Sequence, residues 1–399
     1  MDLESIGATQ VVLGVLFRFW PVGVSLAVVM GLSFAFRKRL GLYGQLFDSG
    51  AGIAGVAICL FWLFTAIFAS IIAPLDPLAQ ISIMKNALPG SIDPGTKQVF
   101  LLGGDRLARD VFSRMVYGSR IVMVIAPFAT TFALIVGIGL GLPAGHYGGR
   151  IDSVLSFLAN LVLAFPVILL FYLLVTPEIR QLSFDNWFSE ATGIGVSVPR
   201  SLAAFIFLLP IIFFLALFHT RFEDRPDRHY VLIGLTMLIG GWIYASFVFD
   251  ADPLGIVHVD PNQLNIFVAV VLGSSPSVFR IVRGLVMDIK TRDYVAAAQT
   301  RGETPWYIML WEILPNARGP LIVDTCLRIG YTTILLGALG YFGLGLAPES
   351  PDWGTSIKDA SRLLRSFIHP ALPPTIALMS FVLGLNLLAD SLREQSMKD

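Results

Sequence analysis

The amino-acid sequence predicts an all-α protein that crosses a membrane several times. Hydrophobic residues make up 55% of the 399 positions and charged residues only 14%, and the mean hydropathy is +0.74. The chain also contains about nine long apolar runs, each close to the roughly 20 residues that an α-helix needs to cross the hydrocarbon core. These three observations place it among the polytopic membrane proteins.

The first apolar run is the least regular of the expected spans, because Arg18 and Pro21 interrupt it. Arg18 is expected to extend its charged end toward a membrane interface. The expected spans, in chain order, are Val11 to Phe36, Ala51 to Ala73, Ile121 to Leu142, Val154 to Val175, Leu202 to Phe218, Val231 to Phe249, Leu264 to Leu285, Leu321 to Gly345 and Pro373 to Leu392.

Basic residues in the short loops predict the orientation of these spans, because Lys and Arg accumulate on the cytoplasmic side of a membrane. Such residues follow the first, fifth and seventh spans, which share one side if the spans alternate. The N-terminus is then outside, and the tail "SLREQSMKD" is in the cytoplasm. The loop residues are Arg37, Lys38, Arg39, Arg221, Arg225, Arg228, Lys290, Arg292, Arg301 and Arg318.

The order of the spans predicts four parts of the chain. Residues 1–50 hold an extra N-terminal transmembrane helix and a basic cytoplasmic loop, and residues 51–175 hold the first half of a core. Residues 176–263 form an inserted helical hairpin with polar flanks, and residues 264–399 complete the core around a cytoplasmic loop at 286–320. Removing the hairpin leaves the topology unchanged, so the pattern indicates a core of six helices plus one early helix and one hairpin.

Composition excludes several classes of function. Lys and Arg total 28, as do Asp and Glu, so a basic surface for nucleic acid is not expected. Cys59 and Cys326 lie inside apolar runs, which indicates neither a disulfide framework nor a metal cluster. The five histidines show no metal-binding spacing, and the N-terminus lacks the features of a removable signal peptide.

The stretch "RDYVAAAQTRGETPWYIMLWEILPN", residues 292–316, is a polar interruption between two apolar spans. Three consecutive alanines favour a helix up to Thr300, Gly302 can end it, and Thr304 with Pro305 suits the start of another. The pattern predicts a helix-turn-helix whose small side chains allow another protein to approach. The part beginning at Trp306 is amphipathic and is expected to lie under the membrane until Pro315 redirects the chain. The alternative is an ordinary surface loop.

The segment 74–120 is assigned to the outside and carries "FLLGGDRLARDVFSRMVYGSRI" near its end. Its apolar residues lie near one helical face, and Arg106, Asp110 and Arg114 are spaced for i,i+4 pairing. The pattern predicts an interfacial helix on the outer surface, and the alternative is a solvated charged helix. Its candidate residues are Asp105, Arg109, Asp110 and Arg114.

A few ionisable residues lie within the spans. Asp324 and Arg328 stand one helical turn apart near the inner end of the eighth span, and Arg280 and Arg283 are near the inner end of the seventh. They either pair internally or snorkel, or they contact the coupling region or the inner mouth of a pathway. Several glycines are expected to allow close approach of helices. They are Gly137, Gly139, Gly141, Gly337, Gly340, Gly343 and Gly345.

Three stretches, taken in order, resemble one family. The pattern Tyr294-Val295-x-Ala297-Ala298-x-x-x-Gly302 followed by Ile313-Leu314-Pro315-Asn316 resembles the EAA loop of permeases in binding-protein-dependent ABC importers, although Ala296 replaces the usual acidic residue. Residues 100–121 resemble the segment before the core spans of dipeptide and oligopeptide importer permeases. The C-terminal pattern Asn386-Leu387-Leu388-x-Asp390-x-Leu392-Arg393 resembles the end of the same permeases. The resemblance covers residues 51–175 and 264–399.

The resemblance implies a type I ABC importer permease core in a bacterial inner membrane. It implies that a coupling helix docks on a separate ATPase subunit, and that the cargo is short peptides or a related small solute. The implied partners are a second homologous permease subunit, two ATPase subunits, an extracytoplasmic solute-binding protein and membrane lipids. The implied coupling residues are Asp293, Tyr294, Ala296, Ala297, Ala298, Arg301, Gly302 and Pro315.

No GxxxxGK[ST] phosphate loop occurs in the sequence, so ATP and Mg are expected on partner ATPase subunits, with no cofactor, metal or catalytic residue in this chain. An ion-gradient-driven secondary transporter or channel is the alternative. It predicts acidic residues at mid-membrane, where only Asp324 comes close. A membrane enzyme is the third possibility, but no cluster of reactive side chains near one membrane face indicates it.

Overall fold

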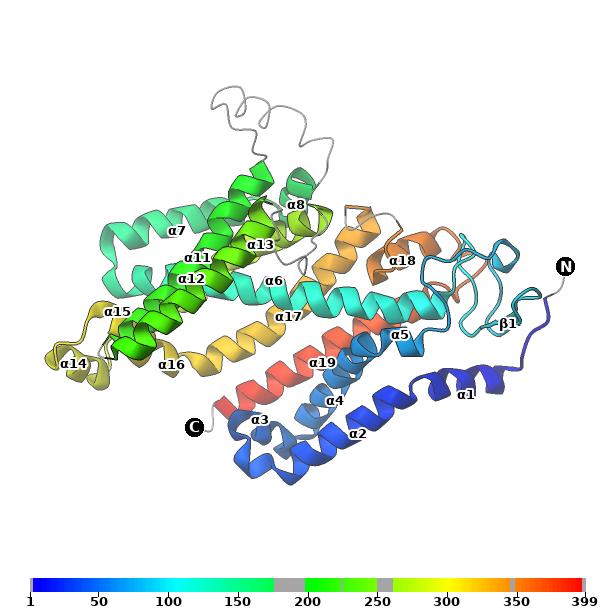
Figure 1. The fold of residues 1–399 in the computed structure, drawn as a ribbon, viewed down its shortest axis with the longest axis horizontal. Helices are drawn as coiled ribbons and strands as arrows, with labels where there is room; N and C mark the ends of the chain where they lie inside the picture. The colour runs from blue at the N-terminus through cyan, green and yellow to red at the C-terminus, as the bar shows by residue number, and fades with distance from the viewer. Residues whose placement is uncertain (1–2, 176–197, 224, 250–260, 345–348, 397–399) are drawn as a thin grey trace, which may run out of the picture. The chain divides into compact units, whose positions relative to one another are not determined.

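The computed structural model describes residues 3–175, 198–223, 225–249, 261–344 and 349–396. Within these ranges the chain is mostly helical, and the longest stretch without an α-helix, residues 73–110, holds a two-stranded sheet in which β1 (Ser91–Ile92) pairs antiparallel with β2 (Val99–Phe100). Figure 1 shows these helices as a ribbon coloured along the chain. The chain divides into two compact units. Unit 1 comprises Met1–Pro127 and Ile322–Asp399, and unit 2 comprises Phe128–Leu321. The prediction of an all-α polytopic protein is confirmed.

Unit 1 is built around two long apolar helices, α4 (Gly50–Ile67) and α19 (Leu372–Ser396), which pack together along their length. Glycines let the two backbones approach, since a Cβ atom added to Gly55 would lie 2.8 Å from the Leu388 amide nitrogen. The indole Nε1 of Trp62 donates to Ser380 across the same contact (3.0 Å). The other elements wholly in unit 1 are α1 (Ala8–Arg18), α2 (Trp20–Ala35), η1 (Arg37–Arg39), α3 (Gly41–Gln45), η2 (Leu46–Asp48), α5 (Ala69–Ile72), η3 (Ser82–Met84) and α18 (Trp353–Ser361).

The first expected span is bent. Helices α1 and α2 meet at Phe19 with an angle of 52° between them. Pro21 stands in the first turn of α2, where its missing N–H causes no loss because the first N–H groups of a helix have no helical partner. The expectation that this span is interrupted around Arg18 and Pro21 is confirmed.

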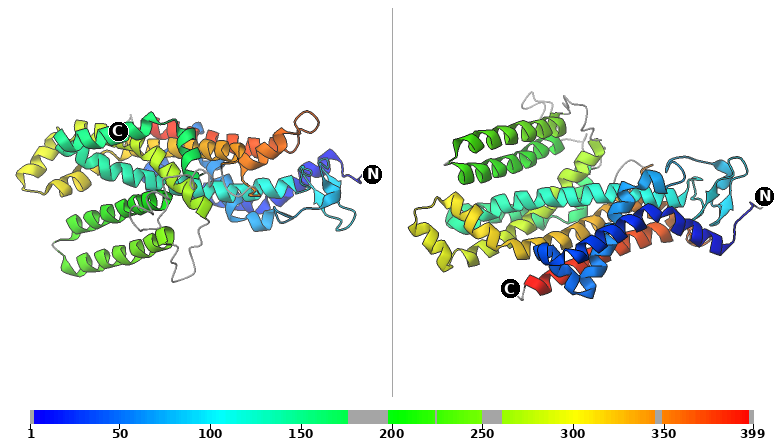
Figure 2. Two further views of the ribbon diagram at one scale, coloured as in Figure 1. Left: turned by 90° about the horizontal axis from the view of Figure 1, so that it is seen from above. Right: turned by 60° about the horizontal axis from the view of Figure 1, so that its bottom comes forward.

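Unit 2 contains the inserted hairpin, the second half of α6 and the loop at 286–320. Helices α11 (Val198–Phe222) and α12 (Pro226–Phe249) lie side by side, as both views of Figure 2 show. Helix α13 (Pro261–Ile289) packs against α7 (Gly149–Ala164) and α8 (Val167–Val175). The remaining elements are α6 (Val111–Tyr147), α14 (Asp293–Thr300), α15 (Pro305–Tyr307), the π-helix η4 (Ile308–Ile313), α16 (Leu314–Asn316) and α17 (Arg318–Phe342), of which α6 and α17 each contribute to both units.

A seam of glycine against valine joins α6 to α13 within unit 2. Three glycines spaced by four residues on α6 face three valines with the same spacing on α13. A Cβ atom added to these glycines would lie 2.5, 2.8 and 2.7 Å from valine side-chain atoms, in the pairs Gly137 with Val278, Gly141 with Val282 and Gly145 with Val286. The expectation for Gly137 and Gly141 is confirmed, and Gly145 extends the seam. At Gly139 the nearest atom outside the α6 backbone would be 3.9 Å away, on Phe213, so that glycine is not needed for close approach.

Glycines on α17 make close contacts within unit 1. An added Cβ at Gly337 would lie 2.6 Å from Leu378 on α19, and one at Gly340 would lie 2.9 Å from the amide nitrogen of Thr355 on α18. At Gly343 the added atom would meet the Lys358 side chain. The expectation of close approach is confirmed for these three glycines, whereas Gly345 lies outside the described residues.

By length and composition, seven described helices are apolar and long enough to cross a membrane, or eight if the bent α1–α2 pair is one span. The prediction of one continuous helix from Val154 to Val175 is wrong. Helix α7 ends at Ala164 and α8 begins at Val167, with Phe165 in an extended conformation before Pro166. The break has a local cause, because the ring of a proline disfavours the helical conformation of the residue before it. The polar flanks expected around the hairpin lie largely outside the described residues.

Candidate functional site

Helix α14 is anchored by one face and exposed on the other. Val295 and Ala298 are fully buried, whereas Tyr294, Ala296 and Ala297 are exposed. The buried pair belongs to a cluster that we call the unit 2 core. It consists of Leu134, Leu142, Val278, Val282, Val286, Ile289, Val295, Ala298, Ile308, Met309, Leu310, Ile313, Ala317 and Leu321. A short helix with an alanine surface is therefore fixed to a packed body.

Gly302 ends α14 as the sequence predicts. Its φ of +79° lies in the left-handed region that favours glycine. The turn satisfies the last carbonyls of the helix, since the amide of Gly302 donates to Gln299 (3.0 Å) and that of Glu303 donates to Ala298 (3.3 Å). Thr304 then caps the next helix by accepting from the Tyr307 amide (3.3 Å). The predicted helix-turn-helix is confirmed.

The second part of the loop is amphipathic, but it is not a single α-helix. One turn of α-helix at α15 leads into the π-helix η4, and α16 follows. Four apolar residues of η4 are buried in the unit 2 core, namely Ile308, Met309, Leu310 and Ile313. An ion pair from Arg301 to Glu312 (2.8 Å) ties the end of α14 to η4. π-Helical turns are rare and occur frequently at functional sites, and nothing in the sequence pattern predicts this one.

The predicted coupling residues differ in exposure. Asp293, Tyr294, Ala296, Ala297, Arg301, Gly302 and Pro315 are exposed, and Ala298 is buried. Partial loss of hydration raises the pKa of the Tyr294 hydroxyl, although the side chain is exposed. Arg292 pairs with Asp288 (3.0 Å), one turn back on the preceding helix. Ala298 therefore anchors the helix, while the other seven residues are exposed.

The predicted interfacial helix over residues 100–121 is wrong in its first half. The chain from Leu101 to Asp110 forms turns and a bridge between Gly104 and Asp110, and α6 begins only at Val111. The charged residues expected on an exposed helical face are buried instead. Asp105, Arg109, Asp110 and Arg114 are each 6% exposed or less.

These residues form a cluster within unit 1 that we call the outer charged cluster, after the sequence-based expectation that segment 74–120 is outside. The Arg109 guanidinium donates to Asp105 (2.7 Å) and to Asp359 on α18 (2.8 Å). Arg114 donates to the carbonyl of Ser350 (2.8 Å) and lies 3.9 Å from Asp105. The predicted pairing among Arg106, Asp110 and Arg114 does not form. Sequence reasoning missed Asp359, because its partners are about 250 residues away in the chain.

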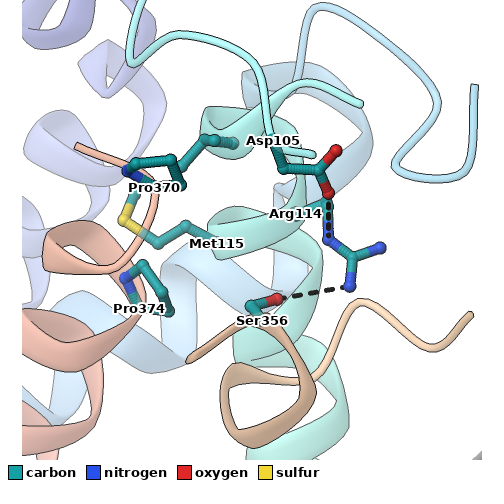
Figure 3. A pocket seen from close by; sticks show the side chains of 7 residues that line it. Asp105, Arg114, Met115, Ser356, Pro370 and Pro374 are labelled. Carbon is teal, nitrogen blue, oxygen red and sulfur yellow. Dashed lines mark hydrogen bonds and ion pairs between the residues drawn. The ribbon is translucent and has the colours of Figure 1, made fainter. Parts of the chain in front are cut away.

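Asp110 accepts hydrogen bonds from the backbone and hydroxyl of Ser113 through one carboxyl oxygen (2.9 and 2.6 Å). Its other oxygen is buried without a hydrogen-bond partner among the described residues. Burial raises the pKa of this carboxyl from 3.8 to about 6. A small cavity of about 10 Å³ lies nearby, lined by Asp105, Arg114, Ser356 and apolar side chains, and has room for about one water molecule (Figure 3).

The ion pair expected from the spacing of Asp324 and Arg328 is confirmed, since the Arg328 guanidinium donates to Asp324 within α17. Arg280 donates to Asn160 on α7 (2.5 Å), and Arg283 forms a forked contact with Asp152 at the start of α7 (2.6 Å for one arm). Hydrogen bonds from Arg283 lower the pKa of Asp152. Internal pairing therefore explains all three arginines. Asp152 was not predicted, because its partner is 131 positions away.

Comparison with known proteins gives one consistent result. A model of the family described as "Binding-protein-dependent transport system inner membrane component" matches residues 137–396, more than half of the chain. The dipeptide transport system permease protein DppC of Haemophilus influenzae is 26% identical over 91% of this chain and 96% of its own length. The DppC of Alkalihalophilus pseudofirmus is 26% identical over 88% and 87%, respectively.

A third relative is named for the transport of a different solute. The glutathione transport system permease protein GsiD of Pectobacterium atrosepticum is 25% identical over 76% of this chain and 74% of its own length. The order of apolar helices, the helix-turn-helix at 293–307 and the family match agree with one another. The chain therefore belongs to the inner-membrane components of binding-protein-dependent transport systems, and it is a multi-pass transmembrane permease subunit of an ABC importer.

Proposed function

We propose that this permease moves short peptides, or a related small solute, that an extracytoplasmic binding protein delivers. The relatives named for dipeptides and for glutathione support this substrate class, because glutathione is itself a tripeptide. The proposed assembly contains a second, homologous permease and two ATPase subunits that bind ATP and Mg. The N-terminus is outside and the C-terminus is in the cytoplasm.

We further propose that α14 is the coupling helix on which an ATPase subunit docks. The observation that carries this proposal is the division of α14 into a buried face and an exposed alanine face. Alanine side chains let a partner approach the helix backbone closely, and Val295 with Ala298 fixes the helix to the unit 2 core. A force applied to the exposed face is therefore passed to the helices that supply the core, among them α13 and α17.

Substitutions at Ala297 test this docking. Ala297→Trp puts a bulky side chain on the exposed face without disturbing the buried one, whereas Ala297→Ser keeps the side chain small at the same position. We expect the tagged Trp variant to insert normally, to lose co-purification of ATPase activity and to lose uptake of labelled dialanine. The Ser variant should retain all three properties. Equal ATPase recovery from both variants, or uptake that persists without ATP, would contradict the proposal.

A further inference from the structure

The inserted hairpin has no role in the proposed function, yet one end of α11 contacts the loop at 293–316. We call this loop the coupling loop, after the role proposed for α14. The side chain of Trp311 in η4 meets two consecutive residues of α11. Its indole Nε1 donates to the hydroxyl of Thr220 (3.2 Å), and the guanidinium carbon of Arg221 lies 4.8 Å from the centre of its ring. Both the polar edge and the face of the indole are therefore used by α11.

The Thr220 hydroxyl suits this contact. It donates its own hydrogen to the carbonyl of Ala216 (2.8 Å), one turn back on α11, so its oxygen lone pairs face outward from that bond. The indole N–H is a donor only and needs such an acceptor when it is partly buried. The geometry orients the indole relative to α11 with two different interactions, a hydrogen bond and a cation–π contact.

Contacts continue from Trp311 to the coupling helix. Phe213, Ala216 and Leu217 of α11 pack against the unit 2 core, which also contains the buried face of α14. Glu312, the neighbour of Trp311, pairs with Arg301 at the end of α14 (2.8 Å). The path from α11 to α14 is therefore both apolar and ionic, and it lies within one compact unit.

The other end of α11 is also fixed within unit 2. The ring of Phe207 stacks on Phe267 of α13 with centroids 5.6 Å apart, and it meets Phe132 of α6 edge-on at 5.3 Å from Phe132's ring centre. Helix α12 differs, since it packs mainly on α11 and only 11% of its most apolar window is buried. Helix α11 therefore contacts other parts of unit 2 near both ends, whereas α12 contacts mainly α11, with one further ring contact from Phe247 to Phe267 of α13.

We propose that α11 is a brace for the coupling loop, with Trp311 as the positioning residue that joins them. The brace holds η4, and through it the end of α14, in a fixed orientation. Helix α11 then moves together with the coupling helix, which gives the inserted hairpin a part in transmitting motion. The transmission step rests on the proposed function of α14, but the bracing of α14 does not.

Hydrogen exchange of the full-length chain in detergent tests the brace. We expect Thr220→Val and Trp311→Phe each to speed amide exchange in 295–302 roughly three- to tenfold, because each removes one partner of a hydrogen bond. The double variant should show little further increase, since it removes both partners together. Arg221→Leu should act in the same direction with a smaller effect.

Thr236→Val is the matched control, because Thr236 on α12 makes the same hydroxyl bond to a carbonyl one turn back (2.8 Å, to Leu232). It should leave exchange in 295–302 unchanged. Exchange at 278–286 on α13 reports whether each variant remains folded. Unchanged exchange at 295–302 in folded Thr220→Val and Trp311→Phe variants would overturn the proposal, and so would effects that simply add in the double variant.

A second measurement separates the brace from the proposed function. In proteoliposomes of the assembled transporter, Trp311→Phe should lower dialanine uptake per ATP hydrolysed at least about twofold, while ATPase subunits still co-purify. If no ATPase co-purifies with the wild-type chain, the proposed coupling role fails and the exchange result alone decides the brace. If ATPase is present and the uptake ratio is unchanged, α11 has no part in transmission.

Discussion

The coupling loop at 293–316 and the outer charged cluster around Arg109 form two contrasting regions of the molecule. In both regions the spacing of residues within a short stretch of sequence predicts a helical structure. The first half of the loop folds as its spacing predicts, with α14, the Gly302 turn and the Thr304 cap in place, whereas the π-helix η4 in its second half is not predicted. The cluster does not fold as predicted, because its charged residues are buried and the stretch before Val111 is not helical.

The difference lies in how far away the decisive partners are. In the loop, the hydrogen bonds that set the turn join residues three to five positions apart, such as Gly302 with Gln299 and Glu303 with Ala298. In the cluster, Arg109 and Arg114 bond to residues 250 and 236 positions away. Charges at i,i+4 spacing look the same in a sequence whether they face solvent or a distant carboxylate. Local spacing is therefore reliable for turns and caps and unreliable for charge burial.

The largest expected effect tests whether the outer charged cluster depends on its distant partner. Arg109→Ala removes the cation that lies between Asp105 and Asp359 and leaves two carboxylates in a buried site. Breaking such a buried pair costs about 3–5 kcal/mol, because among the described residues Asp105 then faces only Arg114 at 3.9 Å and Asp359 only the partly exposed Arg106 at 3.3 Å. Thermal melting of the purified chain in detergent measures this loss of stability. Denaturant titration gives the free energy of unfolding where unfolding is reversible.

Arg106→Ala is the matched control for that variant. The Arg106 side chain is 34% exposed, and its ion pair with Asp359 is longer, at 3.3 Å. We expect it to cost less than about 1 kcal/mol, as partly exposed pairs usually do. Similar losses of stability in the two variants would show that burial of the arginine does not determine its contribution. The contrast with the coupling loop would then disappear.

Asp110 gives a prediction about pH in the same cluster. Its pKa is raised from 3.8 to about 6, so between these values the folded state keeps a proton that the unfolded state has released. The free energy of unfolding therefore falls as pH rises from about 4 to about 6, by up to about 3 kcal/mol. Asp110→Asn cannot ionise and should lose this dependence, which melting curves across that pH range would show.

Asp93 supplies a control of opposite sign within unit 1. Hydrogen bonds from Thr96 lower the pKa of its carboxyl, so its contribution to stability is present at neutral pH and is lost as pH falls through the folded pKa. Asp93→Asn should destabilise the chain at pH 7 more than at low pH. The same pH response from both variants would contradict the assignment of a buried, under-bonded carboxyl at Asp110.

Most of the fold could be predicted because membrane spans are long, apolar and locally encoded. The break between α7 and α8 was also encoded locally, at Pro166, but a count of apolar residues overlooks a single proline. Asp152 and Asp359 could not be found, since each acts through an arginine more than 100 positions away. Trp311 was visible only as part of an amphipathic segment, and its contact with Thr220 depends on the packing of α11.

The glycine seam tests how finely a sequence can identify packing positions. Gly139 and Gly141 look equivalent in the sequence, but an added Cβ atom has 3.9 Å of room at Gly139 and only 2.8 Å at Gly141. Gly141→Ala should cost about 1–3 kcal/mol, because the Val282 side chain or the helices must shift. Gly139→Ala should be neutral or slightly stabilising. Melting in detergent compares the stability of the two variants. Equal destabilisation would contradict the assignment of Gly141, and not Gly139, to the glycine seam.

The smallest expected effect lies in the coupling loop, where the structure is set locally. Gly302→Ala introduces a Cβ at a φ of +79°, with nothing else within 4 Å, so strain is the only change. It should cost about 1–2 kcal/mol of unfolding free energy and speed hydrogen exchange at the end of α14. Gly284→Ala, inside α13 with nothing within 4 Å and no left-handed φ, should instead be neutral or stabilising. A loss at Gly302 that reached the size expected at Arg109 would exceed the strain of one left-handed residue and would contradict the assignment of a purely local turn.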